Sequence, residues 1–323
     1  MKITIDEIAR QSGVSKGTVS RVINCKSTVA ETTRQNVLAV MDRLGYKPDP
    51  VARELSNRSK HIFGIWVGEG ENRLSPYFNL IWRALLREIQ NRATQFIELP
   101  SDLTSVNLQM DAVLIFNCER IEQRLALLSE RGLPAVLIGN NPGIFCVTPD
   151  DYGGGKLAAE HLLSLGHRRL MHLSTTENLQ WAHQRARGFS DAIAEGGVAD
   201  PVRVAQGDAS VLGGYRLMRK MWLNGSRPTG VFCATDEMAI GALGALADLG
   251  VSVPEDVSVV GFDGLVELRP GLTSIGQNIP TIAHEAVSLA LAAIKGTPPR
   301  TVVVPVSLIE GNTTGIPATG LPT

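Results

Sequence analysis

The chain has 323 residues, a formal net charge of −1 and four cysteines. This length is too great for one ordinary core and favours a small domain joined to a larger one. The cysteines, Cys25, Cys118, Cys146 and Cys233, lie far apart, which excludes a CxxC zinc motif and a disulfide framework. No apolar segment fits a signal peptide or a membrane span, so we expect a cytosolic protein without a membrane partner.

Basic residues are concentrated at the start of the chain. Residues 1–60 contain five Lys and six Arg against three Asp and three Glu, a net charge of +5, which leaves about −6 for the rest. This asymmetry favours a nucleic-acid-binding domain followed by a neutral or acidic one.

Two short helices are predicted first. Thr4 and Glu7 have the spacing of a capping box for the first helix, and Gly13 is expected to end it. After a tight turn, Ser15 can cap the second helix. Two short helices joined by a turn that contains Gly are typical of a helix-turn-helix motif.

A third amphipathic helix is predicted over residues 31–44, ending at Gly45, and it allows the three helices to bury a small core. The alternative is that a short helical pair mimics the motif by chance. The basic excess favours a DNA-binding domain over residues 1–47.

The second helix is expected to contact DNA. Helix-turn-helix domains read bases in the major groove from the N-terminal half of this helix. Lys16 and Arg21 are the candidates for base reading, and Gly17 allows close approach. The hydroxyl groups of the same segment are expected to hold phosphates, and they belong to Ser15, Thr18 and Ser20.

Residues 48–60 are predicted to form a hinge. Pro48 and Pro50 break any continuation of the third helix, and the residues after them include too few apolar side chains for a stable isolated helix. We therefore expect this segment to fold only with a partner. The alternative is a simple linker in which Leu55 has no special role.

The segments TIDEIARQSGVSKGTVSRVIN and TRQNVLAVMDRLGYKPDPVARELSNRSK resemble the DNA-binding domain and hinge of the LacI/GalR family of bacterial transcription repressors. In that family the segment equivalent to 50–57 forms a helix on the operator and inserts a leucine into the minor groove, a role that the resemblance assigns to Leu55. The resemblance implies these DNA contacts: Thr4, Ser15, Lys16, Gly17, Thr18, Ser20, Arg21, Asn24, Arg34, Ala52, Arg53 and Leu55.

After residue 60, short apolar runs alternate with amphipathic helical stretches, which predicts parallel sheets with crossover helices. The runs fall into two groups, divided near Pro149, and TVVVPVSLI (301–309) is the last run. We expect an α/β fold of two subdomains, with a ligand at the carboxyl ends of the strands. The expected subdomains are residues 61–149 with 280–296, and residues 150–279 with 297–323.

The stretches DDYGGGKLAAEHLLSLGHRRLMHLS and PTGVFCATDEMAIGALGALADLGVSVPEDVSVVGFDG are similar to the effector domain of the same family, which shares its fold with periplasmic sugar-binding proteins. The resemblance implies a homodimer that binds pseudo-palindromic double-stranded operator DNA under the control of a small effector, a sugar or sugar derivative. The expected protein is a repressor of a carbohydrate-utilisation operon, with no cofactor and no enzymatic activity.

The resemblance also implies effector-binding residues: Tyr77, Phe78, Trp181, Arg185, Thr235, Asp263 and Gln277. Arg185 is equivalent to an arginine that clamps effector hydroxyls or a carboxylate, and Asp263 to an acid that accepts from sugar hydroxyls. Trp181 is a candidate to stack on a sugar ring, with a packed core tryptophan as the alternative. Asp151 and Asp236 are predicted to be helix caps.

Residues 101–110 are too few for an ordinary crossover helix, which puts the family's usual dimer interface in doubt. A helix over residues 76–92, with an apolar stripe at Phe78, Ile81, Leu85 and Ile89, is a candidate to pack against a second copy instead. The C-terminal segment has no leucine heptads, so a coiled-coil tetramer is not expected.

No catalytic motif is found, and the six histidines are predicted to lie at helix ends and on the surface. The alternative function is a cytosolic sugar-binding or sugar-processing α/β protein with a vestigial DNA-binding head.

Overall fold

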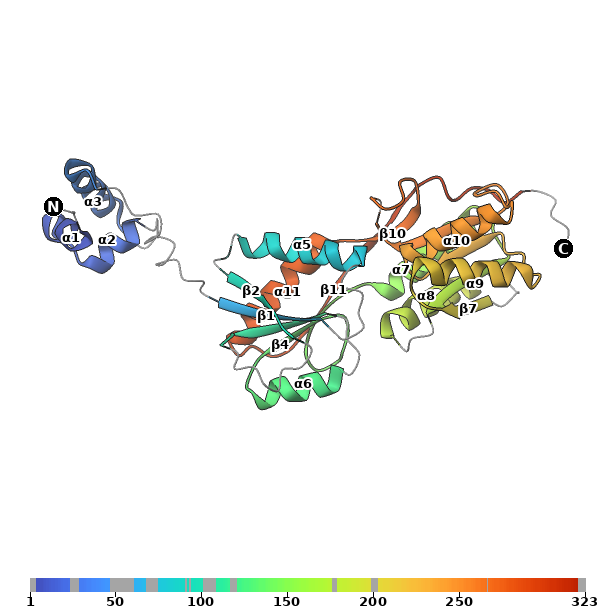
Figure 1. The fold of residues 1–323 in the computed structure, drawn as a ribbon, viewed down its shortest axis with the longest axis horizontal. Helices are drawn as coiled ribbons and strands as arrows, with labels where there is room; N and C mark the ends of the chain where they lie inside the picture. Colours follow the sequence, from blue (N-terminus) through green and yellow to red (C-terminus); the bar gives the residue numbers. More distant parts are fainter. Residues whose placement is uncertain are drawn as a thin grey trace. The chain divides into compact units, whose positions relative to one another are not determined.

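The computed structural model describes residues 4–23, 29–46, 61–67, 75–90, 92, 94–100, 109–116, 121–175, 179–198, 203–265 and 267–318 (Figure 1). The chain divides into two compact units, Met1–Lys60 and His61–Thr323.

The first unit contains the three predicted helices. They are α1 (Ile5–Ser12), α2 (Lys16–Ile23) and α3 (Glu31–Leu44). Their inner faces form a small core that includes the buried side chains of Ile8, Val19, Val22, Val37 and Val40. The prediction of a three-helix domain is confirmed.

The helix ends show which local predictions are right. Gly13 and Gly45 end α1 and α3 with a φ of 66° each, in the left-handed region that favours glycine. The Oγ of Ser15 accepts a hydrogen bond of 3.1 Å from the Thr18 amide, as expected of an N-cap. The capping box at Thr4 is wrong, because the carboxylate of Glu7 accepts from Arg10 and Gln11 instead.

The second unit contains two subdomains, each built on a six-stranded sheet. Sheet A has the order β11-β5-β4-β3-β1-β2, and all its pairs are parallel. Its strands are β1 (His61–Val67), β2 (Thr94–Glu98), β3 (Ala112–Phe116), β4 (Ala135–Ile138), β5 (Phe145–Pro149) and β11 (Thr301–Val304). One face of sheet A is covered by α5 (Pro76–Gln90) and α11 (Ile279–Ile294), and the other by α6 (Ile121–Glu130) (Figure 1). Sheet A and these helices are the first subdomain.

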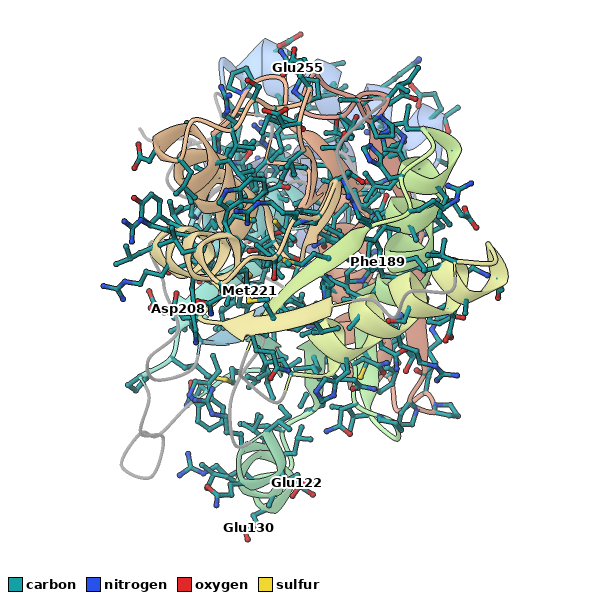
Figure 2. The ribbon with its side chains drawn as sticks, turned by 90° about the vertical axis from the view of Figure 1, so that its right-hand side faces the viewer. Glu122, Glu130, Phe189, Asp208, Met221 and Glu255 are labelled. Atoms are coloured by element: carbon teal, nitrogen blue, oxygen red, sulfur yellow. The ribbon has the colours of Figure 1, made fainter. Side chains whose placement is uncertain are left out.

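Sheet B has the order β12-β10-β9-β8-β6-β7, parallel except for the antiparallel pair of β12 and β10. Its strands are β6 (Leu170–Thr175), β7 (Arg203–Gly207), β8 (Gly230–Cys233), β9 (Ser258–Asp263), β10 (Thr273–Gln277) and β12 (Val306–Ile309). Its helices are α7 (Asp151–Ser164) and α8 (Gln180–Glu195) on one face, and α9 (Val211–Leu223) and α10 (Asp236–Asp248) on the other. Figure 2 marks Phe189, which α8 buries against sheet B, and the exposed Glu122 and Glu130 of α6. Sheet B and its helices are the second subdomain.

The run at residues 301–309 is not one strand. It divides at Pro305 into β11, which pairs with β5 of sheet A, and β12, which pairs with β10 of sheet B. The assignment of residues 297–323 to the second subdomain is therefore wrong for β11. Proline has no N–H to give to a ladder, so it suits the point at which the chain leaves one sheet for another.

Three segments connect the subdomains, and each is a single residue between two regular elements. They are Asp150 between β5 and α7, Asn278 between β10 and α11, and Pro305 between β11 and β12. Two of the connections are joined, because the Asp150 amide donates to the Val304 carbonyl at 2.9 Å.

The apolar stripe of α5 belongs to the core of its own subdomain. Ile81 and Leu85 are buried against sheet A and α11, and Phe78 and Ile89 pack against the same cluster. Ile81 and Leu85 are therefore not available to a second copy, and the packing of this helix against one stays a prediction. Most of the short crossover, residues 101–108, lies outside the described residues.

Candidate functional sites

The outer face of α2 carries the predicted base-reading residues. Lys16, Gly17 and Arg21 are all exposed. The Nζ of Lys16 lies 3.0 Å from a carboxylate oxygen of Asp6, and both side chains remain about two-thirds exposed. An exposed ion pair of this kind contributes little to stability, so it does not prevent Lys16 from contacting another partner.

Two other features of α2 bear on DNA binding. The hydroxyls of Ser15 and Thr18 lie 2.9 Å apart within the cap of the helix. A Cβ placed on Gly17 would meet one neighbouring atom, the Oγ of Ser15 at 3.7 Å, which is ordinary contact. The packing of the domain therefore does not require glycine at position 17, and the helix leaves room for close approach from outside.

The remaining predicted DNA contacts are placed as follows. Thr4 is exposed at the N-cap of α1, and Ser20 is half-buried on α2. Arg34 is half-buried on α3, with its Nε 3.6 Å from a carboxylate oxygen of Glu31. Four predicted residues lie outside the described residues: Asn24, Ala52, Arg53 and Leu55.

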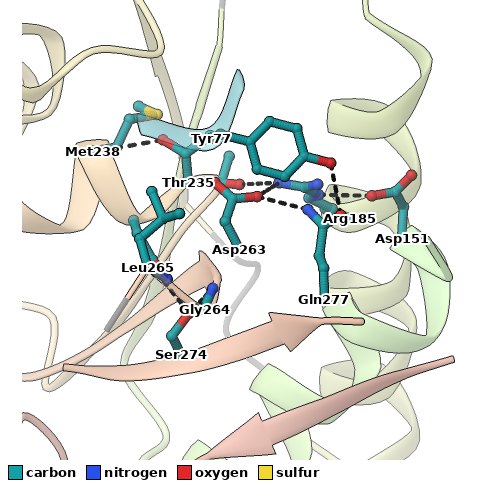
Figure 3. A network of polar contacts seen from close by, with 12 residues as sticks. Tyr77, Asp151, Arg185, Thr235, Met238, Asp263, Gly264, Leu265, Ser274 and Gln277 are labelled. Atoms are coloured by element: carbon teal, nitrogen blue, oxygen red, sulfur yellow. Dashed lines mark hydrogen bonds and ion pairs between the residues drawn. The ribbon is translucent and has the colours of Figure 1, made fainter. Parts of the chain in front are cut away.

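A network of buried polar groups surrounds Arg185 of α8 (Figure 3). Its Nε donates to Oδ1 of Asp151 at 2.9 Å, and its Nη1 donates to the Ala234 carbonyl at 2.6 Å. The same Nη1 lies 3.4 Å from Oδ1 of Asp263. Asp151 is the first residue of α7, Ala234 directly follows β8, and Asp263 ends β9. Two of the three partners thus lie at the carboxyl ends of strands, where ligands bind in open α/β sheets.

Aromatic rings complete the surroundings of the guanidinium. Its central carbon lies 3.4 Å from the ring centroid of Phe262 and 4.6 Å from that of Trp181. Contacts between guanidinium groups and aromatic faces are favourable, and more so when water is excluded. Trp181 is half-buried and packs against the core between sheet B, α9 and α10, so it is both part of the packing and adjacent to Arg185.

A chain of hydrogen bonds leads from Asp263 to the first subdomain. The Nε2 of Gln277 donates to Oδ1 of Asp263 at 2.8 Å, and the hydroxyl of Tyr77 donates to Oε1 of Gln277 at 2.8 Å (Figure 3). Tyr77 belongs to α5, so this chain joins elements of both subdomains. Asp263 has a φ of 122°, a conformation that costs a non-glycine residue energy and is often found at functional sites.

Burial dominates the electrostatics of the network. The pKa of Asp263 is raised to about 8, mainly by burial and also by the nearby Asp236 and Asp151, against the opposing effect of Arg185. Burial also raises the pKa of Asp151, again opposed by Arg185. Burial raises the pKa of Asp236 to about 6, while the hydroxyl of Ser274 lowers it.

Glycines bring α7 and α8 together and so set the position of Arg185. A Cβ on Gly155 would lie 2.2 Å from the Arg185 carbonyl oxygen, and a Cβ on Gly188 would lie 2.0 Å from the Tyr152 carbonyl oxygen. No side chain can be accommodated at such distances. The glycines of the GGGK sequence at residues 153–156 therefore serve the close packing of two helices.

Two predicted helix caps are wrong. The cap of α7 is Asp150, which accepts from the Gly153 amide, whereas Asp151 is turned to Arg185. The cap of α10 is Thr235, which accepts from the Met238 amide at 3.1 Å. In both cases the neighbouring acid is buried and has partners elsewhere.

Asp236 organises the loop after β9 instead of capping α10. Its Oδ2 accepts from the Leu265 amide at 2.6 Å, and its Oδ1 accepts from the Ser274 hydroxyl at 2.7 Å. The sequence interpretation also missed Asp151 and Phe262 as neighbours of Arg185. The available signal was that Asp151 begins the helix after β5 and that Phe262 lies next to the last residue of β9.

The structure separates Phe78 from this polar network. Its ring packs edge-on against Phe116 at 5.2 Å and stacks with Trp82 at 6.1 Å, within the core of the first subdomain. The expectation for the histidines is wrong at His172 and His167, which are buried. His172 lies in β6 and stacks on Phe232, and burial lowers its pKa to about 4.

Within the described part of the chain, no three His, Cys, Asp or Glu side chains are grouped so that they could hold a metal ion. No helix in that part is long and apolar enough to cross a membrane.

Comparisons with known proteins agree with this architecture. Residues 4–49 match the description "Bacterial regulatory proteins, lacI family", and residues 159–314 match a periplasmic binding protein-like domain. The HTH-type transcriptional regulator GalR of Escherichia coli (strain K12) is 32% identical over 314 residues, which cover 91% of this chain and 90% of that protein. The HTH-type transcriptional repressor PurR of Mannheimia succiniciproducens is 32% identical over 309 residues, covering 90% and 92%.

Solved structures give the same result. A complex of the transcriptional regulator CelR with cellobiose has a TM-score of 0.71 at 27% identity, covering 96% of this chain and 99% of the other. The lac repressor dimer bound to operator and the anti-inducer ONPF has a TM-score of 0.71 at 25% identity, covering 98% and 100%. The chain belongs to the LacI family of bacterial transcriptional regulators.

Proposed function

We propose that the protein is a homodimeric repressor that binds a pseudo-palindromic operator and changes its DNA affinity when a sugar occupies the site around Arg185. The observation that carries this proposal is the combination of an exposed basic face on α2 with the buried polar network of the second unit. Relatives that share both parts are named as transcriptional regulators.

The contacts with DNA are assigned to three kinds of residue. Lys16 and Arg21 read base edges in the major groove, where Gly17 lets the helix approach closely. The hydroxyl-bearing residues of α2 hold phosphates and fix the register of the domain. Leu55 inserts into the minor groove, a role that rests on the family resemblance.

The effector site is assigned to Arg185, Asp263 and Gln277, with Trp181 and Tyr77 at its border. Tyr77 belongs to the first subdomain and Gln277 to the second, so a ligand at this point changes the contacts between the two subdomains. We infer that the ligand selects one arrangement of the subdomains and so biases the pairing of the hinges on DNA. CelR and the lac repressor, which have the same fold, are described with cellobiose and with ONPF bound.

The test is binding of the full-length protein to genomic DNA fragments, followed by titration of the selected fragment with sugars. We expect one fragment to be bound with a steep salt dependence and to be released or retained by one sugar. Equal affinity for the selected fragment and random DNA would contradict the proposal, as would a fragment affinity that no sugar changes.

A further inference from the structure

We propose that Asp111 and His61 are positioning residues for operator binding, because together they anchor the chain where it enters sheet A from the predicted hinge. This inference rests on the proposed function, since it concerns how an operator-binding segment is held. His61 is the first residue of β1 and of the second unit, and the predicted hinge ends at residue 60.

The start of β1 is paired unevenly with its two neighbours. β1 lies between β2 and β3 in sheet A. On the β2 side the ladder begins at His61, which pairs with Thr94, whereas on the β3 side it begins two residues later, where Phe63 pairs with Ala112. The backbone groups of Ile62 that are directed towards β3 therefore need partners beyond the regular ladder.

Asp111, which directly precedes β3, supplies both partners. Its amide donates to the Ile62 carbonyl at 2.8 Å, and its carboxylate Oδ2 accepts from the Ile62 amide at 2.7 Å. The carboxylate thus takes the place of a backbone carbonyl, and a hydrogen bond to a charged acceptor is stronger than one to a neutral acceptor. The side chain is 43% exposed, so this pairing extends β1 at the surface of the subdomain.

His61 is held by the same carboxylate and by an aromatic ring. Its Nδ1 lies 3.6 Å from Oδ2 of Asp111 and has no hydrogen-bond partner among the described residues. The imidazole stacks on the fully buried Phe63, with the ring centroids 6.1 Å apart and the planes 19° apart. The first side chain after the predicted hinge is therefore packed against the core of the subdomain.

This anchoring reduces the entropy that operator binding has to remove. Ordering the backbone of one residue costs about as much free energy as a tenfold change in affinity. If His61 and Ile62 were free in the unbound protein, the operator would have to order them in addition to the hinge. The contacts with Asp111 and Phe63 order them in advance.

The experiment compares variants of Asp111 in the full-length protein. Operator affinity is measured by fluorescence anisotropy on the DNA fragment selected in the test of the proposed function. Asp111→Ala leaves the Ile62 amide without its acceptor and should weaken operator affinity about tenfold. Asp111→Asn keeps an acceptor oxygen and should restore most of that affinity. The matched control, Glu130→Ala, removes an exposed acid of the same subdomain and should leave operator affinity unchanged.

Two further measurements separate positioning from a loss of folding. Hydrogen exchange at the Ile62 amide should be about tenfold faster in Asp111→Ala than in the wild type, because a hydrogen bond to a charged group is lost. Urea unfolding of the second unit should change little. If Asp111→Ala does lower stability, His61→Ala gives the test: it leaves both Ile62 hydrogen bonds in place and should weaken operator affinity about threefold through the lost stacking.

The outcomes distinguish this inference from the proposed function. Wild-type operator affinity in Asp111→Ala would overturn the inference, and so would an Asp111→Asn affinity as low as that of Asp111→Ala. In both cases the proposed function stands, because the wild-type protein still binds the selected fragment. If the wild-type protein binds no fragment more tightly than random DNA, the proposed function fails, and the inference fails with it.

Discussion

Replacing Arg185 by Met should destabilise the second unit strongly, and more at high pH than at low pH. The side chain of Met fills much of the same space, but it leaves Asp151 and Asp263 buried without a cation. Removing one partner of a buried ion pair costs about 3–5 kcal/mol. We expect a loss of this size in the free energy of unfolding near pH 8.

The pH dependence follows from the two carboxyl groups. Without Arg185, the folded pKa values of Asp151 and Asp263 rise further above their unfolded values near 3.8. The substitution adds to the loss only between the folded pKa of each carboxyl group with Arg185 present and its higher folded pKa without Arg185, by up to about 1.4 kcal/mol per unit of pH. For Asp263 this range begins near pH 8, and for Asp151 it begins above 3.8. The loss should therefore be larger at pH 8 than at pH 5.

Urea unfolding followed by tryptophan fluorescence measures this loss, because all four tryptophans follow residue 60 and report on the second unit. Arg187→Met is the matched control on the same helix: its side chain is 70% exposed, so it should change stability by about 0.5 kcal/mol or less. Adding Asp263→Asn to Arg185→Met should recover at least about 1 kcal/mol near pH 8. A loss below about 1 kcal/mol, or one independent of pH, would refute the reasoning.

Further predictions concern both units. Arg21→Ala and Lys16→Ala should each weaken operator binding by about 1–3 kcal/mol and have a smaller effect on binding to random DNA. If a mobility-shift titration shows equal losses on operator and random DNA, the two side chains contact phosphates and do not read bases. Leu55→Ala should reduce DNA bending in a permuted-site mobility assay, and unchanged bending would exclude the insertion of Leu55 into the minor groove. Trp181→Ala should weaken effector binding by about 0.5–1.5 kcal/mol beyond the effect of the lost contact area, and it should leave operator affinity in the absence of effector unchanged. If calorimetry shows unchanged effector affinity, the ring serves packing alone.

The features that depend on local sequence were predictable. The helix over residues 31–44 was expected with the ends that the structure shows, because its apolar spacing and Gly45 both act within a few residues. The alternation of strands and helices was likewise sufficient for two α/β subdomains. The predicted effector residues Arg185, Asp263 and Gln277 are brought together by direct contacts, and Tyr77 joins them through Gln277.

The features that depend on distant partners were not predictable. A run of nine strand-forming residues does not reveal that Pro305 divides it between two sheets. Asp151 is as good a cap by sequence as Asp150, and the choice is made by Arg185, which lies 34 residues further along the chain. His172 has a polar side chain, but it lies in an interior strand of sheet B and is completely buried.

The single-residue connections limit how the second unit can move. Asp150 and Asn278 are also N-caps, so each is held by a hydrogen bond to the helix that follows it. The φ of Pro305 is fixed by its ring. Such connections are expected to restrict sliding and twisting of one subdomain against the other more than rotation about the connections. If the proposed function is right, Pro305→Gly should loosen this restriction and weaken the coupling of effector binding to operator binding while both sheets stay folded.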